Sequence, residues 1–488
     1  MDTQKLRQRI LDLAIRGKLV PQDPNDEPAS VLLERIRAEK ERLIAEGKIK
    51  RPKAKKSTDK SHYQQFAPPF DIPDSWEWVR LEDIARIGTG ATPSKSNRKY
   101  YGGNINWVSS SATSSLYVDV PTDFITELAL KETNCEIYPI GTLLMAMYGE
   151  GKTRGQVTEL RIEAASNQAC AAIIPHIAAT KNFVKLYLLA NYYQLRRLAE
   201  GGNQPNLNLG KISSLYIPIP PVQEQQRILE QYRYIIESIE LIEKSKALLG
   251  ERIYTVKSKI LDLAMQGKLV PQDPADEPAA DMLRRINPKA KIITDNPQCR
   301  NLPLGWTLCQ LRDLCSFLSR GKSPKYSETP NQYPVFAQKC NLKDGDISLT
   351  QARFLDENTI SKWPEKYRLR DGDVLVNSTG TGTVGRTRMF KSEYLGNYPF
   401  VVPDSHVSVV RSFDEIDSTY IFYCLYCQDG QQYFAENLAG STNQKELYID
   451  VIGDKSIMLP PINEQKRIVA KIEEQYSVLY EIEASLRS

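Results

Sequence analysis

Basic and amide side chains gather in three Gly-, Asn- or Ser-rich loop segments in each half of the chain. Arg and Lys can contact nucleic-acid phosphates or guanine edges, and Asn and Gln can pair with adenine. The candidates for DNA contact in the first half are Lys95, Arg98, Lys99, Tyr100, Tyr101, Asn104, Lys152, Arg154, Gln156, Asn203 and Gln204. Those in the second half are Arg320, Lys322, Lys325, Tyr326, Arg386, Arg388, Asn443, Gln444 and Lys445. Basic loops are often only solvated, so residue chemistry alone makes each of these a candidate.

Two segments are similar to cofactor-binding or catalytic motifs, but their context or their residues do not fit that chemistry. The sequence GTGTVG (380–385) fits G-x-G-x-x-G, but a dinucleotide site needs a helix next, and RTRMFKSEYLGNYP is strand-like and turn-rich. It is more typical of a hairpin turn. FAPPF (66–70) is similar to the N-P-P-F site of adenine-N6 methyltransferases, yet Ala67 stands where an amide or carboxylate must hold the amine. No Walker A or G-x-S-x-G sequence occurs. The sequence therefore predicts no catalytic residue in this chain.

Composition excludes several other classes of protein. The net charge of +4 over 488 residues means that DNA-binding cations must be clustered. The three histidines, His62, His176 and His406, lie far apart, so we expect no histidine-based metal site. Cys424 and Cys427 form a C-x-x-C within the apolar run YIFYCLYC and are expected in a helix core. The sequence has no stretch of ~18 apolar residues, and MDTQKLRQRI has no signal-peptide core, so we expect a cytoplasmic protein without membrane contact.

An internal repeat determines the expected architecture. Residues 6–36 and 256–286 share ILDLA-x-x-GKLVPQDP, and 20 of 31 aligned positions are identical. PPVQEQQRI (220–228) and PPINEQKRI (460–468) match at six of nine positions. The C-terminus carries only the first part of the central helical stretch, and the N-terminus only the last part. Joining the termini would complete a second copy, which is a circular pseudo-two-fold repeat.

The helical parts of the repeat predict a coiled coil. Residues 223–266 place Ile, Leu and Tyr at steps of three and four, with Gly267 at the expected end. Such a helix cannot bury its apolar stripe alone, and the N- and C-terminal segments offer antiparallel partners. Two ordinary bundle helices are the alternative. Asp26 is expected to cap a second helix with Pro28 in its first turn, which ends near Gly47. The basic run 48–60 is either a solvated linker or a phosphate contact.

We therefore predict an α+β fold in which two mixed α/β domains are separated by a long antiparallel helical coiled coil. The middles of the two copies have diverged, and each combines β-rich stretches, turns and one late helix. The predicted parts are an N-terminal helix 1–18, connector helix and basic linker 19–70, domain 71–220, central helix 221–268, connector 269–298, domain 299–459 and C-terminal helix 460–488.

Over its whole length the chain resembles the specificity subunits of type I restriction–modification systems. The resemblance rests on the two ILDLA-x-x-GKLVPQ-x-P segments, the two PP-x-x-EQ-x-RI segments, the loop G-x-TP…YYGGNINWV (88–108) and ASNQAC (165–170). It implies two target-recognition domains that each read one half of a split, asymmetric DNA target in host defence. The long helices would act as a ruler between the half-sites. Transfer is weakest in the first loop of the second copy, where GKSPKYSETPNQYPVFAQ replaces TPSKSNRKYYGGNINW.

The resemblance also implies the partners: double-stranded DNA, two modification (methyltransferase) subunits, and restriction subunits that carry the motor and nuclease. S-adenosylmethionine, Mg and ATP would belong to those partners, which leaves this chain without a cofactor or enzymatic activity. Three alternatives stay open. A fused methyltransferase would methylate DNA without partners. A helical-spacer adaptor or receptor-binding protein would bind no duplex. The third alternative, the specificity subunit of a type IIG-like system, would be distinguished by the genes that neighbour it.

Overall fold

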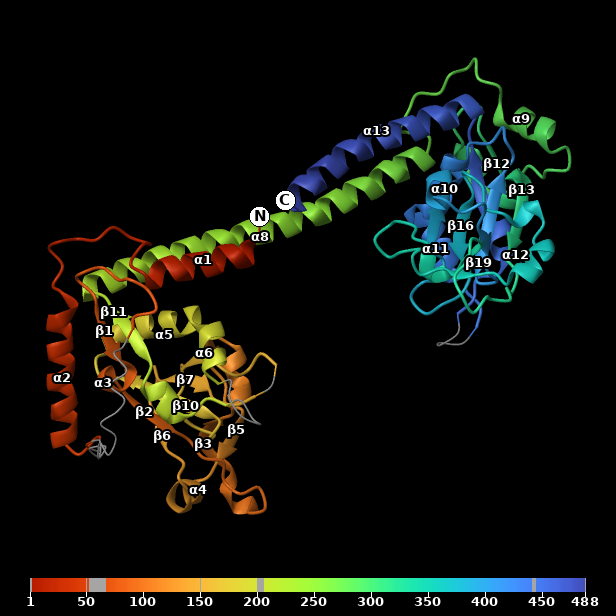
Figure 1. The fold of residues 1–488 in the computed structure, drawn as a ribbon. Helices are drawn as coiled ribbons and strands as arrows, with labels where there is room; N and C mark the ends of the chain where they lie inside the picture. Colours follow the sequence, from red (N-terminus) through yellow and green to blue (C-terminus); the bar gives the residue numbers. More distant parts are fainter. Residues whose placement is uncertain are drawn as a thin grey trace. The chain divides into compact units, whose positions relative to one another are not determined.

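The computed structural model describes residues 2–49, 51, 67–149, 151–199, 206–440 and 445–487. The chain divides into two compact units, Met1–Lys244 and Ser245–Ser488. Helix α8 (Val222–Met265, 44 residues) supplies a segment to each unit, and its bounds confirm the long helix predicted for 223–266 (Figure 1). Most of the predicted basic run 48–60 lies outside the described residues.

In the first unit, helix α1 (Thr3–Ile15) lies antiparallel to the first part of α8 (Figure 1). Arg7 near the start of α1 forms an ion pair of 2.9 Å with Glu243. At the other end, Ala14 and Ile228 share one buried hydrophobic cluster. This pairing buries part of the apolar stripe of α8, which would otherwise be exposed to water.

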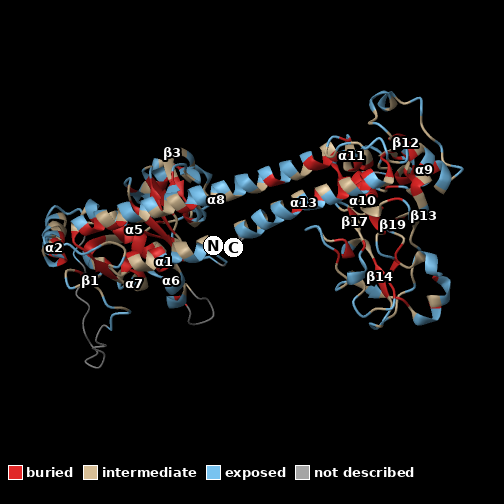
Figure 2. Ribbon diagram, turned by 90° about the horizontal axis from the view of Figure 1, so that it is seen from above, coloured by how far each residue is buried: buried red, intermediate tan, exposed pale blue. Residues whose placement is uncertain are grey.

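In the second unit, helix α13 (Ile462–Arg487) lies antiparallel to the remaining part of α8. The Lys246 ammonium donates to the carbonyl of Leu486 over 2.9 Å, and the Tyr476 hydroxyl donates to the carbonyl of Lys257 over 2.9 Å. Each part of α8 therefore has its own antiparallel partner, α1 in one unit and α13 in the other. Figure 2 shows exposed residues along both α8 and α13.

The mixed α/β domain of the first unit is closed by strands from its two ends. Strand β1 (Glu77–Arg80) pairs antiparallel with β11 (Tyr216–Ile219). A five-stranded sheet has the order β2 (Ala85–Thr89), β10 (Cys170–Pro175), β7 (Leu143–Ala146), β8 (Val157–Leu160) and β4 (Tyr117–Val118). A four-stranded sheet has the order β5 (Asp123–Ile125), β3 (Tyr101–Val108), β9 (Ala164–Ser166) and β6 (Ile137–Tyr138). The helices of the first unit outside α1 and α8 are α2 (Ala29–Ala45), α3 (Leu81–Ile84), α4 (Glu127–Glu132), α5 (Lys181–Ala190), α6 (Tyr192–Leu198) and α7 (Leu209–Ser213).

The second unit repeats this plan with different sheets. Strand β12 (Thr307–Gln310) pairs with β20 (Ser456–Leu459), as β1 pairs with β11. A four-stranded sheet has the order β13 (Cys315–Arg320), β19 (Val407–Ser412), β16 (Val374–Asn377) and β17 (Thr387–Met389). A three-stranded sheet has the order β15 (Arg353–Phe354), β14 (Pro334–Phe336) and β18 (Val402–Pro403). Its helices besides α8 and α13 are α9 (Ala279–Ile286), α10 (Ser418–Tyr426), α11 (Gln428–Glu436) and α12 (Ile449–Asp454).

Two local predictions were wrong. Pro28, not Asp26, is the N-cap of α2, because the Asp26 carboxylate instead accepts hydrogen bonds from Arg227 of α8. The single late helix expected in each domain is broken in two, at Asn191 between α5 and α6 and at Cys427 between α10 and α11. Cys427 has an extended backbone that ends α10. A tertiary hydrogen bond and a local backbone break are both hard to see in an amphipathic sequence pattern.

The two cysteines of the C-x-x-C lie in the core of the second unit. Cys424 and Cys427 are buried in the hydrophobic cluster that joins α10 to α8 and α13, consistent with their place in an apolar run. Among the described residues, no group of His, Cys, Asp and Glu side chains is arranged to hold a metal ion. Within those same residues, none of the helices combines the length and apolar character that crossing a bilayer requires.

Candidate nucleic-acid interface

In the first unit, loops from four parts of the mixed α/β domain meet at one edge. The loop after β2 contacts the β9–β10 turn through the Thr92 hydroxyl, which donates to Gln168 Oε1 over 2.5 Å. That turn contacts the β7–β8 turn, since the Met147 amide donates to the carbonyl of Ala169 over 2.7 Å. Leu207, after α6, donates its amide to the carbonyl of Met147 over 3.1 Å. We call residues 90–104, 147–149, 151–156, 167–169 and 206–208 edge 1.

The second unit builds the same junction from a diverged sequence. The Ser378 amide donates to the carbonyl of His406, and the Leu447 amide donates to the carbonyl of Ser378, both over 2.8 Å. The loop after β13 joins them through Gly321, whose amide donates to the carbonyl of Val407 over 2.9 Å. We call residues 320–326, 378–388, 403–406 and 445–447 edge 2. The described parts of the three loop segments whose residue chemistry stood out in each half therefore converge, together with a fourth segment that residue chemistry did not single out.

The Gly-rich sequences form hairpin turns, as the sequence indicated. In edge 2 the turn joins β16 to β17, and Gly380, Gly382 and Gly385 have φ values of +103°, +75° and +82°. Residues with a Cβ rarely adopt these values. A strand follows the turn, so the helix that a dinucleotide site requires is replaced by β17.

The cations of the first loop of edge 1 face solvent. Lys95, Arg98 and Lys99 are exposed, and no carboxylate of the described residues lies within ion-pair distance of them. Asn104 is also exposed. Two tyrosines hold the loop in place. The Tyr100 hydroxyl donates to the Glu132 carboxylate over 2.9 Å, and the Tyr101 hydroxyl donates to the carbonyl of Pro93 over 2.6 Å. The loop therefore presents charge on a braced backbone.

Helix α6 braces the Gly-rich turn of edge 1. The Tyr192 hydroxyl donates to the carbonyl of Lys152 over 2.6 Å, and the Arg196 guanidinium donates to that of Arg154 over 2.9 Å. The Lys152 side chain is exposed, whereas Arg154 and Gln156 are half-buried. The two remaining candidates of the first half, Asn203 and Gln204, lie outside the described residues.

The cations of the first loop of edge 2 are engaged within the domain. Arg320 pairs with Glu446 over 2.5 Å, and Lys325 pairs with Asp356 over 2.7 Å. Lys322 donates to the carbonyl of Lys362 over 3.1 Å. The Arg353 guanidinium stacks 3.6 Å from the centre of the Tyr326 ring. The two edges therefore have the same construction and different electrostatics.

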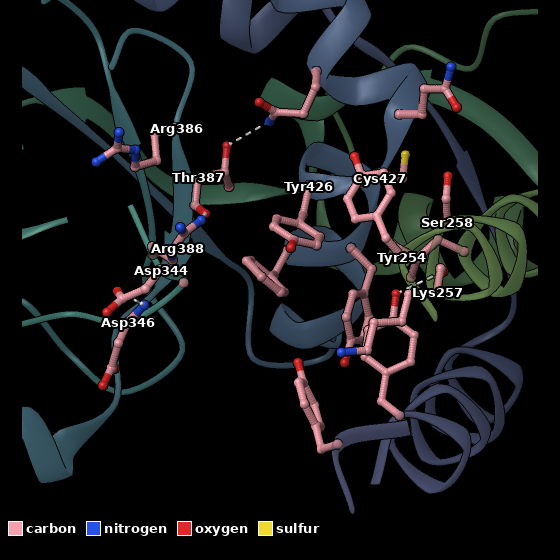
Figure 3. Close-up of a pocket in the computed structure, with 18 of the residues that line it drawn as sticks. Tyr254, Lys257, Ser258, Asp344, Asp346, Arg386, Thr387, Arg388, Tyr426 and Cys427 are labelled. Carbon is pink, nitrogen blue, oxygen red and sulfur yellow. Dashed lines mark hydrogen bonds between the residues drawn. The ribbon is translucent and has the colours of Figure 1, made fainter. Parts of the chain in front are cut away.

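Arg386 and Arg388 hold a neighbouring loop in place. Arg386 donates to the carbonyl of Asn341 over 2.5 Å, and Arg388 donates to that of Leu342 over 3.0 Å. Burial lowers the pKa of the Arg388 guanidinium. Both line one wall of a groove of about 1380 Å³ whose other wall includes Tyr254 of α8 (Figure 3). Of the three remaining candidates in the second half, Lys445 is exposed, and Asn443 and Gln444 lie outside the described residues.

The turn before β10 in the first unit, and before β19 in the second, is the segment that residue chemistry missed. It presents Gln168 in edge 1 and His406 in edge 2, both exposed. The Thr379 hydroxyl and His406 Nδ1 lie 2.8 Å apart, so this turn touches the Gly-rich turn directly. One Gln or one His in a short turn carries little signal in a sequence. Only the ASNQAC segment pointed to this place, and it did so through family resemblance.

Known proteins are similar to this chain over most of its length. The family described as "Type I restriction modification DNA specificity domain" matches residues 73–251 and 303–487. The specificity subunit of the type I restriction enzyme EcoEI of Escherichia coli is 26% identical, over 99% of this chain and 91% of that protein. The EcoAI specificity subunit of the same species is 28% identical, over 77% of this chain and 72% of that protein.

Solved structures share the fold. A chain from a structure of a type I R-M system, described for its complex assembly and conformational transition, has a TM-score of 0.56 and 18% identity. The match covers 86% of this chain and 94% of that one. The HsdS subunit from Thermoanaerobacter tengcongensis has a TM-score of 0.53 at 18% identity, and the match covers 86% and 95% of the two chains.

Proposed function

The chain belongs to the type I restriction–modification DNA specificity family, and we propose from this premise that it reads a bipartite, asymmetric DNA target through edges 1 and 2. It is a specificity subunit of such a system. The observation that carries the proposal is the repeated junction of three loop segments, Met147–Ala169–Leu207 in one unit and Ser378–His406–Leu447 in the other. A scaffold kept twice while its exposed side chains diverge suits two related domains that read different sequences.

The two edges differ in ways that favour unlike half-sites. Two identical domains on a two-fold frame would read a palindrome. Edge 1 offers the exposed cations Lys95, Arg98 and Lys99, which suit phosphate contacts. Edge 2 keeps Arg320 and Lys325 in ion pairs, and beside the exposed Lys445 it offers neutral groups such as Thr379. Such groups discriminate by hydrogen bonds to base edges. We therefore expect an asymmetric target.

The helices would dock two modification subunits, one on each unit. Several large apolar side chains on them are exposed: Tyr234 is 67% exposed and Leu241 66% on the first part of α8, and Tyr254 is 76% exposed on the second part. Apolar side chains gathered on one surface are typical of interaction sites. Restriction subunits would join this assembly. S-adenosylmethionine, Mg and ATP would be bound by these partner subunits, which would carry out methylation and cleavage.

The test is a genome-wide methylation map of cells that express this chain with its modification subunit. We expect a split, asymmetric motif that disappears when this chain is deleted. Exchanging residues 71–220 for those of a relative should change one half of the motif and leave the other half intact. Methylation that persists unchanged after the deletion would overturn the proposal, and absence of duplex binding with the partner present would favour an adaptor.

A further inference from the structure

A buried glutamate joins three separate parts of the first unit. Glu224 lies in the first turn of α8 and is 1% exposed. Its Oε1 accepts a hydrogen bond of 2.7 Å from Gln22, in the connector after α1. Its Oε2 accepts a bond of 2.9 Å from the indole of Trp76, at the start of the recognition domain. One carboxylate thus connects the helix pair, the connector and the domain.

The same place is closely packed. Gln22 Nε2 also lies 3.2 Å from the carbonyl of Gly17, at the end of α1. Gly17 has a φ of +67°, and a Cβ there would lie 2.5 Å from the ring of Pro73. Trp76 packs edge-on against Phe183 of α5, with ring centres 5.7 Å apart. The polar bonds of Glu224 are therefore set within rigid contacts between the helix end and the domain.

The second unit contains the equivalent group. Glu464, in the first turn of α13, is fully buried and accepts a bond of 3.0 Å from Gln272, which also donates to the carbonyl of Gly267. Burial raises the pKa of Glu464, and both Gln272 and the nearby indole of Trp306 oppose that rise. Trp306 occupies the place of Trp76, but its N–H does not reach the hydrogen-bond geometry that Trp76 has. The junction is thus doubled, with a weaker indole contact in the second copy.

A partly exposed ion pair accompanies each buried glutamate one turn further along the helix. Arg227 pairs with Asp26, and Arg467 pairs with Asp276 over 2.7 Å. Burial raises the pKa of Glu224, against the effect of its hydrogen bonds to Trp76 and Gln22. Removing a carboxylate from water is costly, and a well-packed apolar residue often gives equal or greater stability. Because this costly group occurs in both copies, we expect it to specify how each domain is oriented against its helices.

We infer that Glu224 and Glu464 are positioning residues that fix the direction of each recognition domain against its helix pair. This inference rests on the proposed function, because the direction of a domain matters most when two half-sites must be read at a fixed spacing. A glutamate accepts at both oxygens, so it can receive Gln22 and Trp76 together. A glutamine in place of Glu224 would turn its own N–H toward the N–H of either Gln22 or Trp76, so one of the two hydrogen bonds would be lost. The domain would then be held less firmly, while its recognition edge stays intact.

The experiment uses the complete complex with the modification subunit. Methylation rates are measured on duplexes that carry the correct target, on duplexes with one base pair added to or removed from the spacer, and on duplexes with one altered half-site. We expect Glu224→Gln to reduce discrimination between spacer lengths about tenfold, the effect of removing one hydrogen bond to a buried charge. Discrimination against an altered half-site should be unchanged. The matched control is Glu237→Gln, which removes an exposed carboxylate from the same helix.

Two tryptophan variants test the inference without altering the buried charge. Trp76→Phe removes a well-formed hydrogen bond to Glu224 and should relax spacer discrimination, whereas Trp306→Phe removes a buried N–H that lacks such a bond and should relax it much less. Equal behaviour of the two variants would overturn the inference, as would unchanged spacer discrimination in Glu224→Gln. If the glutamine variant does not assemble, the tryptophan pair decides. Failure of the proposed function is separate, because the unaltered complex would then show no sequence-specific methylation.

Discussion

At the scale of single residues, cations of the same type differ in what they are free to do. Lys95 and Arg98 are exposed without a carboxylate of the described residues beside them, whereas Lys325 already pairs with Asp356. An exposed ion pair contributes little to stability, but it partly neutralises the charge that a phosphate would attract. The side chains of the two edges should therefore contribute unequally to DNA affinity.

The salt dependence of DNA binding measures this difference. Changing both Lys95 and Arg98 to Ala should weaken binding to every duplex and lower the slope of log K against log salt by about 0.9 for each phosphate that is no longer neutralised. Lys325→Ala should leave the slope near that of the unaltered protein. The measurement is fluorescence anisotropy of the complex with its modification subunit over a series of salt concentrations. Equal slopes for all three proteins would contradict this assignment.

At the scale of elements, glycines decide where helices end and how closely they approach the domains. Gly17 ends α1 with φ +67° and leaves no room for a Cβ beside Pro73. Gly250 lies within α8, and a Cβ there would meet no atom within 4 Å. The first glycine is required by tertiary packing, whereas the second only weakens a helix.

These two glycines therefore predict opposite effects of the same substitution. Gly17→Ala should destabilise the first unit by about 2–3 kcal/mol, because it adds both backbone strain and a clash. Gly250→Ala should stabilise α8 by up to about 1 kcal/mol, the difference in helix propensity. Thermal unfolding of the complex with the modification subunit measures both. A fall in Tm for both variants would show that the surface of α8 near Gly250 is needed for another contact.

At the scale of the whole molecule, the proposed ruler depends on the length of α8. Helix α8 contributes to both units, and each part has an antiparallel partner of its own. Insertion of four residues near Lys246 would keep the apolar stripe roughly in phase and lengthen the helix by ~6 Å. We expect a longer spacer or loss of activity with both half-sites unchanged, measured by a methylation map. Altered half-sites would contradict the ruler.

The sequence by itself determined the elements that depend on local pattern or on repetition. The period of apolar residues located α8 to within one residue at each end, because helical burial repeats every three to four positions. The Gly-rich sequence 380–385 indicated a hairpin turn, since only a turn tolerates so many residues with positive φ. The duplicated ends of the copies predicted two related domains, and the matches at 73–251 and 303–487 agree.

Only the tertiary structure decided which side chains are available. Arg320 and Lys325 look like DNA contacts in a basic loop, but their partners Glu446 and Asp356 lie far away in the sequence. Asp26 has the composition of a helix cap, yet it binds Arg227, which lies 201 positions later. Gln168 gains its place on edge 1 because its turn is hydrogen-bonded to the loop after β2 and to the β7–β8 turn. These contacts join segments that are distant in the sequence, and the local spacing of residues does not show which distant segments will pack together.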